Sequence, residues 1–246
     1  VPLFLEELRC FGLAPLLFDQ AKPTRWLDLG VGPGTLFWGL SWWAKHRGIS
    51  FDYIGLEQSK QFCALASELA ISLQNELKNR VSAKAQFLNA DLVKGVSAEL
   101  ARIDPKVVSL MNCIAEIAPD LQKRESWFLN LVDQLGVLAK KSGQPRWVII
   151  VEPGSQASSR ELLALREKLR ERSDVRIWLP CFDASQCGAL VKPSDWCHVE
   201  ASVEFPRWMS DLGTAAQLRK ESVLFSYLVI SVGGDFSNFQ WPSHAS

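Results

Sequence analysis

The sequence predicts an α/β fold in which helices cover both faces of a mostly parallel β-sheet. The main observation is a regular alternation of short apolar runs with helical stretches after residue 24, because parallel strands need crossover helices that cover the sheet. The second observation is a glycine-rich loop directly after the first apolar run. The third is a pair of strand-like segments, 199–205 and 223–232, without a full helix between them, which predicts an antiparallel closing pair.

Five strands and four helices are expected in the alternating part of the chain. The strands span residues 25–29, 52–56, 86–88, 107–111 and 147–151. The first helix, 35–47, has Leu36, Leu40 and Trp43 on one side and Gly48 as its stop. The next two helices carry apolar stripes. The stripe of the second helix is Phe62, Ala66, Leu69, Leu73 and Leu77, and that of the third is Trp127, Leu131, Leu135 and Leu138. The fourth is a charged helix over the segment 156–172.

The pattern changes near residue 179. The segment 179–197 is rich in Pro, Gly, Ser and Cys and has no periodicity, which favours a structured loop or insert. Apolar residues then alternate from Val199 to Phe205, as in a half-buried strand, and a last apolar run spans 223–232. We therefore expect a helical lead-in at 1–23, a core at 24–178, a cysteine-rich insert at 179–198, and a closing hairpin with a frayed tail at 199–246.

The composition excludes several classes of protein. The 27 basic and 27 acidic side chains cancel, so no overall electric field would attract nucleic acid. No stretch approaches about eighteen consecutive apolar residues, so we expect no membrane span, and the segment Val1–Leu5 lacks the basic start of a secretory signal. Six unevenly spaced cysteines are too few for a disulfide scaffold, which predicts an intracellular, reducing compartment.

The most informative segment is the loop Asp28-Leu29-Gly30-Val31-Gly32-Pro33-Gly34. Glycines at alternating positions after a strand let the backbone turn sharply and approach a ligand closely. The dinucleotide-binding version needs a small residue where this chain has Thr35, and no phosphate-binding lysine follows the loop. An acidic residue two positions before the glycines therefore suits a cationic, phosphate-free nucleotide, with Asp28 facing its ammonium group.

Two further acids follow strands at positions where such a ligand would need them. Glu57 ends the second strand and could accept hydrogen bonds from both ribose hydroxyls, and Asp91 follows the third and could accept one from an adenine amine. Because open α/β sheets bind ligands at the carboxyl ends of their strands, both would share one rim with Asp28. The alternative is that Glu57 and Asp91 are ordinary helix caps or first-turn acids.

Through this loop, Glu57 and Asp91, the chain resembles the class I S-adenosylmethionine-dependent methyltransferases over residues 24–155 and 199–232. The resemblance implies a Rossmann-like, seven-stranded sheet with an antiparallel closing strand. It also implies that S-adenosylmethionine is held by Asp28, Gly30, Gly32, Gly34, Glu57, Asp91 and Leu92.

The sequence gives weaker evidence about the residues that would bind the methyl acceptor. In this fold the methyl donor points toward the end of the fourth strand, so Asn112 and Glu116 are the candidate catalytic residues. The chain lacks the [DN]-P-P-[YF] tetrad that positions planar amines in many methyltransferases, and Pro180-Cys181 lies outside the strand-end loops that hold a cysteine nucleophile. Methyl transfer can proceed mainly by alignment, because the sulfonium supplies the reactivity.

Three cysteines, Cys181, Cys187 and Cys197, fall within a short aperiodic loop. Thiolates suit zinc or iron–sulfur clusters, but the spacing alone fits incidental small apolar residues equally well. The order of Glu152-Pro153-Gly154, this loop, Trp196-Cys197-His198 and Phe225–Val229 resembles the mitochondrial small-subunit ribosome methyltransferase-like family and its bacterial relatives. That resemblance implies association with the small ribosomal subunit and its RNA, and a [4Fe–4S] cluster with these three cysteines as ligands.

The chain departs from that family in two places. The family's fourth cysteine has no counterpart before Ser246, and Phe182 stands where relatives have proline. Either the sequence is truncated, or the cluster is lost, or its fourth ligand is replaced; His198 is a candidate, but its adjacency to Cys197 makes joint ligation awkward. The basic residues between Arg160 and Arg176 alternate with acids, which predicts a solvated, salt-bridged helix face rather than an RNA patch.

Three functions stay open on the sequence. The first is methylation of small-subunit ribosomal RNA, the second a non-catalytic assembly factor that keeps the donor site, and the third a small-molecule methyltransferase. We expect a monomer that has no membrane contact. Its location would be the bacterial cytoplasm or the mitochondrial matrix.

Overall fold

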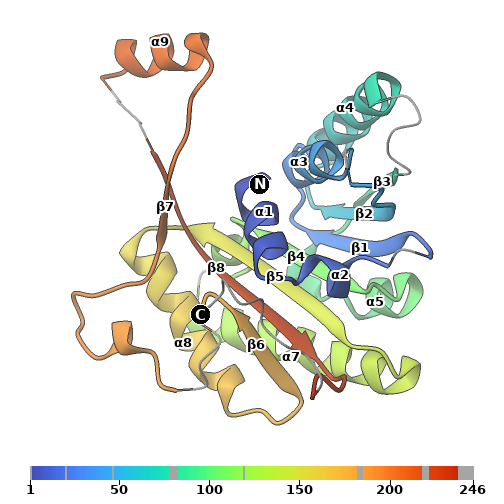
Figure 1. The fold of residues 1–246 in the computed structure, drawn as a ribbon, viewed down its shortest axis with the longest axis vertical. Coiled ribbons are helices and arrows are strands. Elements are labelled where there is room, and N and C mark those ends of the chain that lie inside the picture. The colour runs from blue at the N-terminus through green and yellow to red at the C-terminus, as the bar shows by residue number, and fades with distance from the viewer. Residues whose placement is uncertain are drawn as a thin grey trace.

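The structure is a computed structural model that describes residues 2–19, 21–45, 47–77, 83–118, 120–181, 185–217 and 222–237. A central twisted sheet is flanked by helices, and an arm that carries one helix extends away from the body (Figure 1). No helix in the described ranges combines the length and the apolar composition needed to cross a lipid bilayer. The predicted frayed tail, from residue 238 onward, lies outside the described residues.

Within these ranges, eight strands form one sheet in the order β3-β2-β1-β4-β5-β8-β6, and β7 pairs with β8 beside that path. The strands β1 to β5 are parallel to their neighbours, whereas β8 runs antiparallel to β5, β6 and β7. The strand bounds are β1 Thr24–Leu29, β2 Phe51–Glu57, β3 Ala83–Asn89, β4 Val107–Met111, β5 Arg146–Pro153, β6 Val175–Leu179, β7 Val199–Ser202 and β8 Ser222–Val232.

The predicted α/β, Rossmann-like fold is confirmed, and so is the antiparallel closing pair. The strand count differs from the seven that the resemblance implies, because β7 adds an eighth, four-residue strand along β8. Leu29 at the end of β1 lies opposite Leu56 of β2 and Leu110 of β4. The carboxyl ends of these central strands are therefore level, and the loops that follow them meet at one edge of the sheet.

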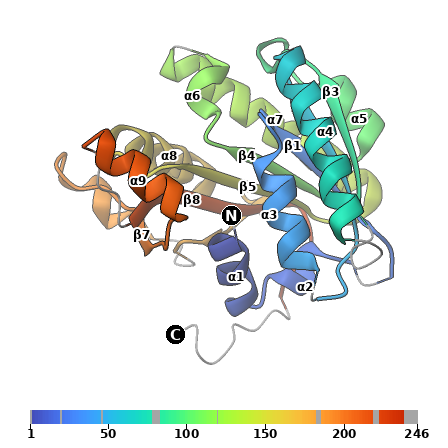
Figure 2. The ribbon, with the colours of Figure 1, turned by 90° about the horizontal axis from the view of Figure 1, so that it is seen from above.

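Helices cover both faces of the sheet. Residues of α1, α2, α3 and α4 share one apolar core with Trp26, whereas residues of α5, α7 and α8 share the other core with Leu27. Neighbouring residues of β1 thus point to opposite faces, as a strand requires, and Figure 2 shows α1 and α7 on opposite sides of the sheet. The helix bounds are α1 Pro2–Cys10, α2 Ala14–Leu17, α3 Thr35–Ala44, α4 Lys60–Leu77, α5 Ser97–Ile103, α6 Ile114–Ile117, α7 Leu121–Ser142, α8 Gln156–Arg170 and α9 Arg207–Ala215, with short 3₁₀ turns η1 Leu92–Lys94 and η2 Gly188–Leu190.

Every strand predicted in the alternating part is present, but several elements differ. Phe62 was assigned to the buried stripe of its helix, which is wrong: the residue is 46% exposed, and the neighbouring Cys63 faces the core beside the correctly assigned Ala66. The helices α5 and α9 and the strand β6 were not predicted. The two helices span only seven and nine residues, too few for a helical period to identify them, whereas the five-residue strand β6 was missed although strands of that length were predicted elsewhere.

The arm consists of β7, the start of β8 and the helix α9 between them (Figure 1). The strand pair was predicted, but α9 was not. None of the residues of α9 is buried, and Trp208 and Leu212 are 64% and 63% exposed. Val203 and Val223 in this part of the chain also line the cavity described next, so the arm contributes to the wall of that cavity.

Candidate functional site

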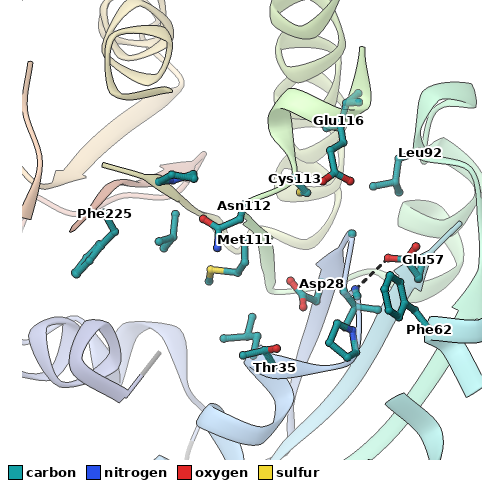
Figure 3. Close-up of a pocket in the computed structure, with 18 of the residues that line it drawn as sticks. Asp28, Thr35, Glu57, Phe62, Leu92, Met111, Asn112, Cys113, Glu116 and Phe225 are labelled. Atoms are coloured by element: carbon teal, nitrogen blue, oxygen red, sulfur yellow. Dashed lines mark hydrogen bonds between the residues drawn. The ribbon is translucent and has the colours of Figure 1, made fainter. Parts of the chain in front are cut away.

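A cavity of about 900 Å³ opens at the carboxyl ends of β1, β2, β4 and β5. This is the edge at which open α/β sheets bind their ligands, and the volume suits a nucleoside-sized ligand with a second group beside it. Figure 3 shows side chains around it, from Glu57 and Phe62 on one side to Phe225 on the other. Its polar or acidic lining residues are Asp28, Thr35, Glu57, Gln58, Ser59, Asn112 and Glu116.

The predicted glycine loop forms one wall of the cavity. Gly30 and Gly32 have φ of +71° and +53°, a region that glycine enters without the steric penalty of a Cβ. A Cβ on Gly30 would lie 2.8 Å from the Cβ of Cys113, so a side chain there would clash. A Cβ on Gly32 would meet no atom within 4 Å, because the backbone there borders the open cavity.

Glu57 lies at the end of β2 and holds the glycine loop in place. Its Oε2 accepts a hydrogen bond from the backbone N–H of Gly32 at 3.0 Å (Figure 3). Its Oε1 accepts one from the N–H of Ser59 at 2.8 Å. The residue is 8% exposed and lines the cavity. A carboxylate offers about four lone-pair sites, so each oxygen retains one that faces no partner among these backbone groups.

Asp28 lines the cavity but lies deeper than expected, with 1% of its surface exposed. The hydroxyl of Ser109 donates a hydrogen bond to its Oδ1 at 2.6 Å, and the hydroxyl of Tyr53 donates to its Oδ2. Burial raises the pKa of the Asp28 carboxyl to about 7, although both hydroxyls lower it. The same burial, with the neighbouring Asp28, raises the pKa of Tyr53. The carboxyl of Asp28 therefore titrates near neutral pH.

The remaining predicted cofactor residues divide into two groups. Leu92 lines the cavity, and the indole of Trp127 fixes it by donating to its carbonyl oxygen at 2.7 Å. Gly34, by contrast, packs against Ala66 and is not among the lining residues. Asp91 is not among them either. It caps η1 by accepting from the N–H of Val93, and it pairs with Lys94 at 3.2 Å, as the alternative interpretation of this residue predicts.

The loop after β4 brings both candidate catalytic residues to the cavity. Asn112 and Glu116 line it and are exposed there, and Asn112 has a left-handed φ of +56°. The buried Glu152 supports this loop, because its Oε1 accepts hydrogen bonds from the N–H groups of Cys113 and Ile114, both at 3.1 Å. Burial raises the pKa of Glu152, although those two backbone hydrogen bonds lower it.

Several lining residues were not singled out as site residues by the sequence, and Phe62, Val93, Leu224 and Phe225 are among them. Phe62 and Val93 lie on the side of Glu57, and Phe225 and Leu224 lie on the opposite side; Figure 3 shows Phe62 and Phe225 at opposite ends of the cavity. Such residues look like core positions in a sequence. The signal that could have found Phe62 is its place one turn after Glu57, whereas Phe225 depends on how β8 aligns with β5.

The cysteine loop lies against α8 rather than at the cavity. The guanidinium of Arg160 donates to the carbonyl oxygens of Ala189, Lys192 and Asp195, at 3.2, 3.0 and 2.6 Å. Glu167 accepts from the N–H of Cys187 at 3.2 Å. Side chains of α8 thus hold the loop through hydrogen bonds to its backbone.

Cys181 and Cys187 lie near enough to Cys197 to act electrostatically on its thiol. All three cysteines are free, and burial, followed by the neighbouring Cys181 and Cys187, raises the pKa of Cys197. However, in the part of the chain that the structure describes, which omits 182–184, no three His, Cys, Asp or Glu side chains are placed to hold a metal ion. The predicted iron–sulfur or zinc site is not supported by this arrangement.

The charged helix agrees with its prediction as a salt-bridged face. Arg170 pairs with Glu167 at 3.1 Å, and Lys168 pairs with Glu125 of α7. At the end of the same segment, Arg172 pairs with Asp133 at 2.7 Å. These cations are neutralised within the protein, so this helix offers no concentrated positive patch.

The comparisons with known proteins point to one family. The family profile described as mitochondrial small ribosomal subunit Rsm22 matches residues 16–238. No curated protein matches the sequence. Among solved structures, StiE O-MT shares 12% identity over 93% of this chain and 74% of its own, with a TM-score of 0.44. The human methyltransferase 10 domain containing protein shares 14% over 94% and 82%, with a TM-score of 0.43. A SAM dependent methyltransferase from Aquifex aeolicus shares 14% over 93% and 98%, with a TM-score of 0.34. Likenesses this distant carry no argument about the function of the chain.

Proposed function

Because the chain belongs to the family of the mitochondrial small ribosomal subunit protein Rsm22, we propose that it is an S-adenosylmethionine-dependent methyltransferase that acts on RNA of the small ribosomal subunit. The family description names the ribosomal partner, and the cavity supports the cofactor. We propose the mitochondrial matrix as its compartment, with the cytoplasm as the bacterial counterpart.

The single observation that carries the proposal is the pairing of the glycine loop with Glu57. The N–H of Gly32 is already bound to the carboxylate of Glu57, while the Cα of Gly32 borders open space in the cavity. A flat nucleoside can therefore approach the backbone closely, and its ribose hydroxyls can donate to the free lone pairs of Glu57. Leu92, Val93 and Phe62 supply apolar contacts for the adenine on the same side.

The charge of the cavity fits a cation. Asp28, Glu57 and Glu116 are acidic, and no lysine or arginine occurs among the described residues that line the cavity. A phosphate-bearing nucleotide would meet only like charges there. The carboxyl of Asp28, with its pKa near 7, would lose its proton when a positive group binds beside it.

S-adenosylmethionine supplies an activated methyl group when bound, so the protein needs mainly to align the acceptor. Asn112, on the rigid loop that Glu152 supports, would orient the acceptor through its side-chain amide. Glu116 lies on the same loop region, lines the cavity, and would accept the proton that the acceptor releases.

The test is transfer of a labelled methyl group from S-adenosylmethionine to purified small ribosomal subunits, to their naked RNA and to their proteins. We expect label in the RNA, and Asn112→Ala should lower the rate by about 100-fold, in the range typical for loss of a positioning or acid–base group. If calorimetry shows that the cofactor binds but no acceptor is ever labelled, the chain is instead a non-catalytic assembly factor.

A further inference from the structure

The cavity has a second half that the proposed cofactor site does not use. It lies beyond Met111 and Asn112, on the side away from Asp28 and Glu57 (Figure 3). Its walls come from β5, β8 and the base of the arm, and they are almost entirely apolar; the residues are Val151, Pro153, Val203, Val223, Leu224 and Phe225. Asn112 provides the polar group between the two halves.

This wall is apolar yet open. Val223 and Leu224 are 40% and 42% exposed, and Val223 lies on the same face of β8 as Phe225. Contiguous exposed apolar surface is unfavourable in water and commonly marks a binding site. The second half of the cavity is therefore suited to a ligand with an apolar face.

Phe225 is held firmly in this wall. Its partner across the sheet is Pro153, and the next residue, Gly154, lets the two strands approach, because a Cβ there would lie 2.8 Å from the backbone carbon of Leu224. The Phe225 ring packs against Tyr227 with centroids 5.9 Å apart, and Tyr227 donates a hydrogen bond to Glu7 at 2.6 Å. The ring is thus fixed before any ligand arrives, which lowers the entropic cost of binding.

We propose, building on the proposed function, that this half binds the methyl acceptor as an unpaired nucleobase stacked on Phe225, with its polar edge toward Asn112. An aromatic ring offers stacking to any base, and an amide can both donate and accept, as base edges require. With no cation among the described lining residues, the phosphates remain outside, so the base enters alone, turned out of the RNA stack.

The experiment is photocrosslinking of small-subunit RNA transcribed with 4-thiouridine or, separately, 6-thioguanosine, with S-adenosylhomocysteine present in excess. The crosslinked peptide is mapped by mass spectrometry. We expect a crosslink within 223–225 in the wild type. Phe225→Leu keeps an apolar side chain without a ring and should reduce it by about tenfold, in line with about 1–3 kcal/mol for stacking on one base. Phe225→Trp should retain it.

Phe62→Leu is the matched control, because it removes a ring from the opposite half of the cavity. It should weaken binding of S-adenosylhomocysteine in calorimetry and leave the Phe225 crosslink unchanged once that ligand is saturating. Thermal unfolding of each variant verifies that it folds; Phe225→Met replaces Phe225→Leu, and Phe225→Tyr replaces Phe225→Trp, if either does not fold.

An equal crosslink in Phe225→Leu, or crosslinks confined to other surfaces, would overturn the inference while leaving the cofactor site intact. Uptake of an apolar fluorophore that RNA cannot displace would also overturn it, and would favour a small-molecule acceptor. Failure of the wild type to bind S-adenosylhomocysteine would instead refute the proposed function itself.

Discussion

In the half of the cavity beside the glycine loop, the polar groups already hold one another, whereas the half beside β8 consists of apolar side chains that no part of the described chain covers. Glu57 is bonded to Gly32 and Ser59, while Val223 and Leu224 stand 40% and 42% exposed. The first half is therefore a preformed site, in which ligand binding depends on the shape of the backbone. The second gains its stabilisation only when a ligand covers it.

The largest effect on cofactor affinity is expected from a side chain that fills the space beside the glycine loop. Gly32→Leu places a side chain into the space beside the loop and should lower affinity for S-adenosylmethionine by about 100-fold or more, equivalent to about 2.8 kcal/mol. Gly48→Leu is the matched control, because Gly48 also has a positive φ, +63°, and open space around its Cα but lies away from the cavity. Calorimetric titration measures both. An equal loss of affinity in the two variants would mean that backbone strain, and not the filled space beside the loop, explains the effect.

The next largest effect distinguishes Glu57 from Asp91, the two acids that the sequence analysis assigned to one cofactor site. Glu57→Ala would remove the proposed acceptor of two ribose hydroxyls and should weaken binding by about 30-fold, or about 2 kcal/mol. Asp91→Ala should change affinity by less than about threefold, because Asp91 caps η1 and pairs with Lys94. The same titration decides, and a larger loss for Asp91 than for Glu57 would contradict this placement.

A smaller, pH-dependent effect is expected from Asp28. Its carboxyl titrates at about 7, and a bound cation favours its ionised form. Affinity for S-adenosylmethionine should therefore rise by up to about tenfold from pH 6 to pH 8, since one pKa unit corresponds to a factor of ten. In Asp28→Asn the profile should be flat. A wild-type profile that is equally flat would show that Asp28 does not sense the ligand's charge.

The same group affects stability in the free protein. Because the pKa of Asp28 is raised from 3.8 to about 7, the folded state binds the proton more tightly than the unfolded state. Its contribution to stability is therefore fully present below about pH 4 and is lost as the pH rises to about 7. Denaturant unfolding measures this. Between about pH 4 and pH 7, the free energy of unfolding of the wild type should fall with pH relative to that of Asp28→Asn.

The smallest effect on cofactor binding is expected from a change at the cysteine loop, which lies away from the cavity and serves as a control region. Arg160→Ala removes three hydrogen bonds to loop carbonyls and should speed amide exchange in 188–197 and lower the free energy of unfolding by about 1–2 kcal/mol. Affinity for S-adenosylmethionine should stay unchanged. Lys168→Ala, which removes a surface pair on the same helix, should alter neither; a change in cofactor affinity for Arg160→Ala would link the two regions.

The parts of the site that the sequence could predict are those encoded locally. The glycine loop is recognisable because the left-handed φ of Gly30 and Gly32 needs glycine, and Glu57 because it directly follows an apolar strand. The fold class follows from the strand–helix alternation. These features depend on residues close together in the chain.

What the sequence could not predict depends on contacts between distant segments. Asp28 is buried because Tyr53 and Ser109, on the two neighbouring strands, donate to it, and no local pattern records that. Phe225 reaches the cavity through its register opposite Pro153. The helix α9 buries nothing in the described structure, so its short sequence has no core-facing stripe to identify.

The most direct test of the central claim is a crystal structure of the protein with S-adenosylhomocysteine. We expect the ribose hydroxyls to hydrogen-bond to Glu57, the adenine to lie beside Leu92 and Phe62, and the sulfur to face Asn112, with the half walled by Phe225 still open. A ligand bound elsewhere, or a glycine loop refolded across its own cavity, would contradict the account.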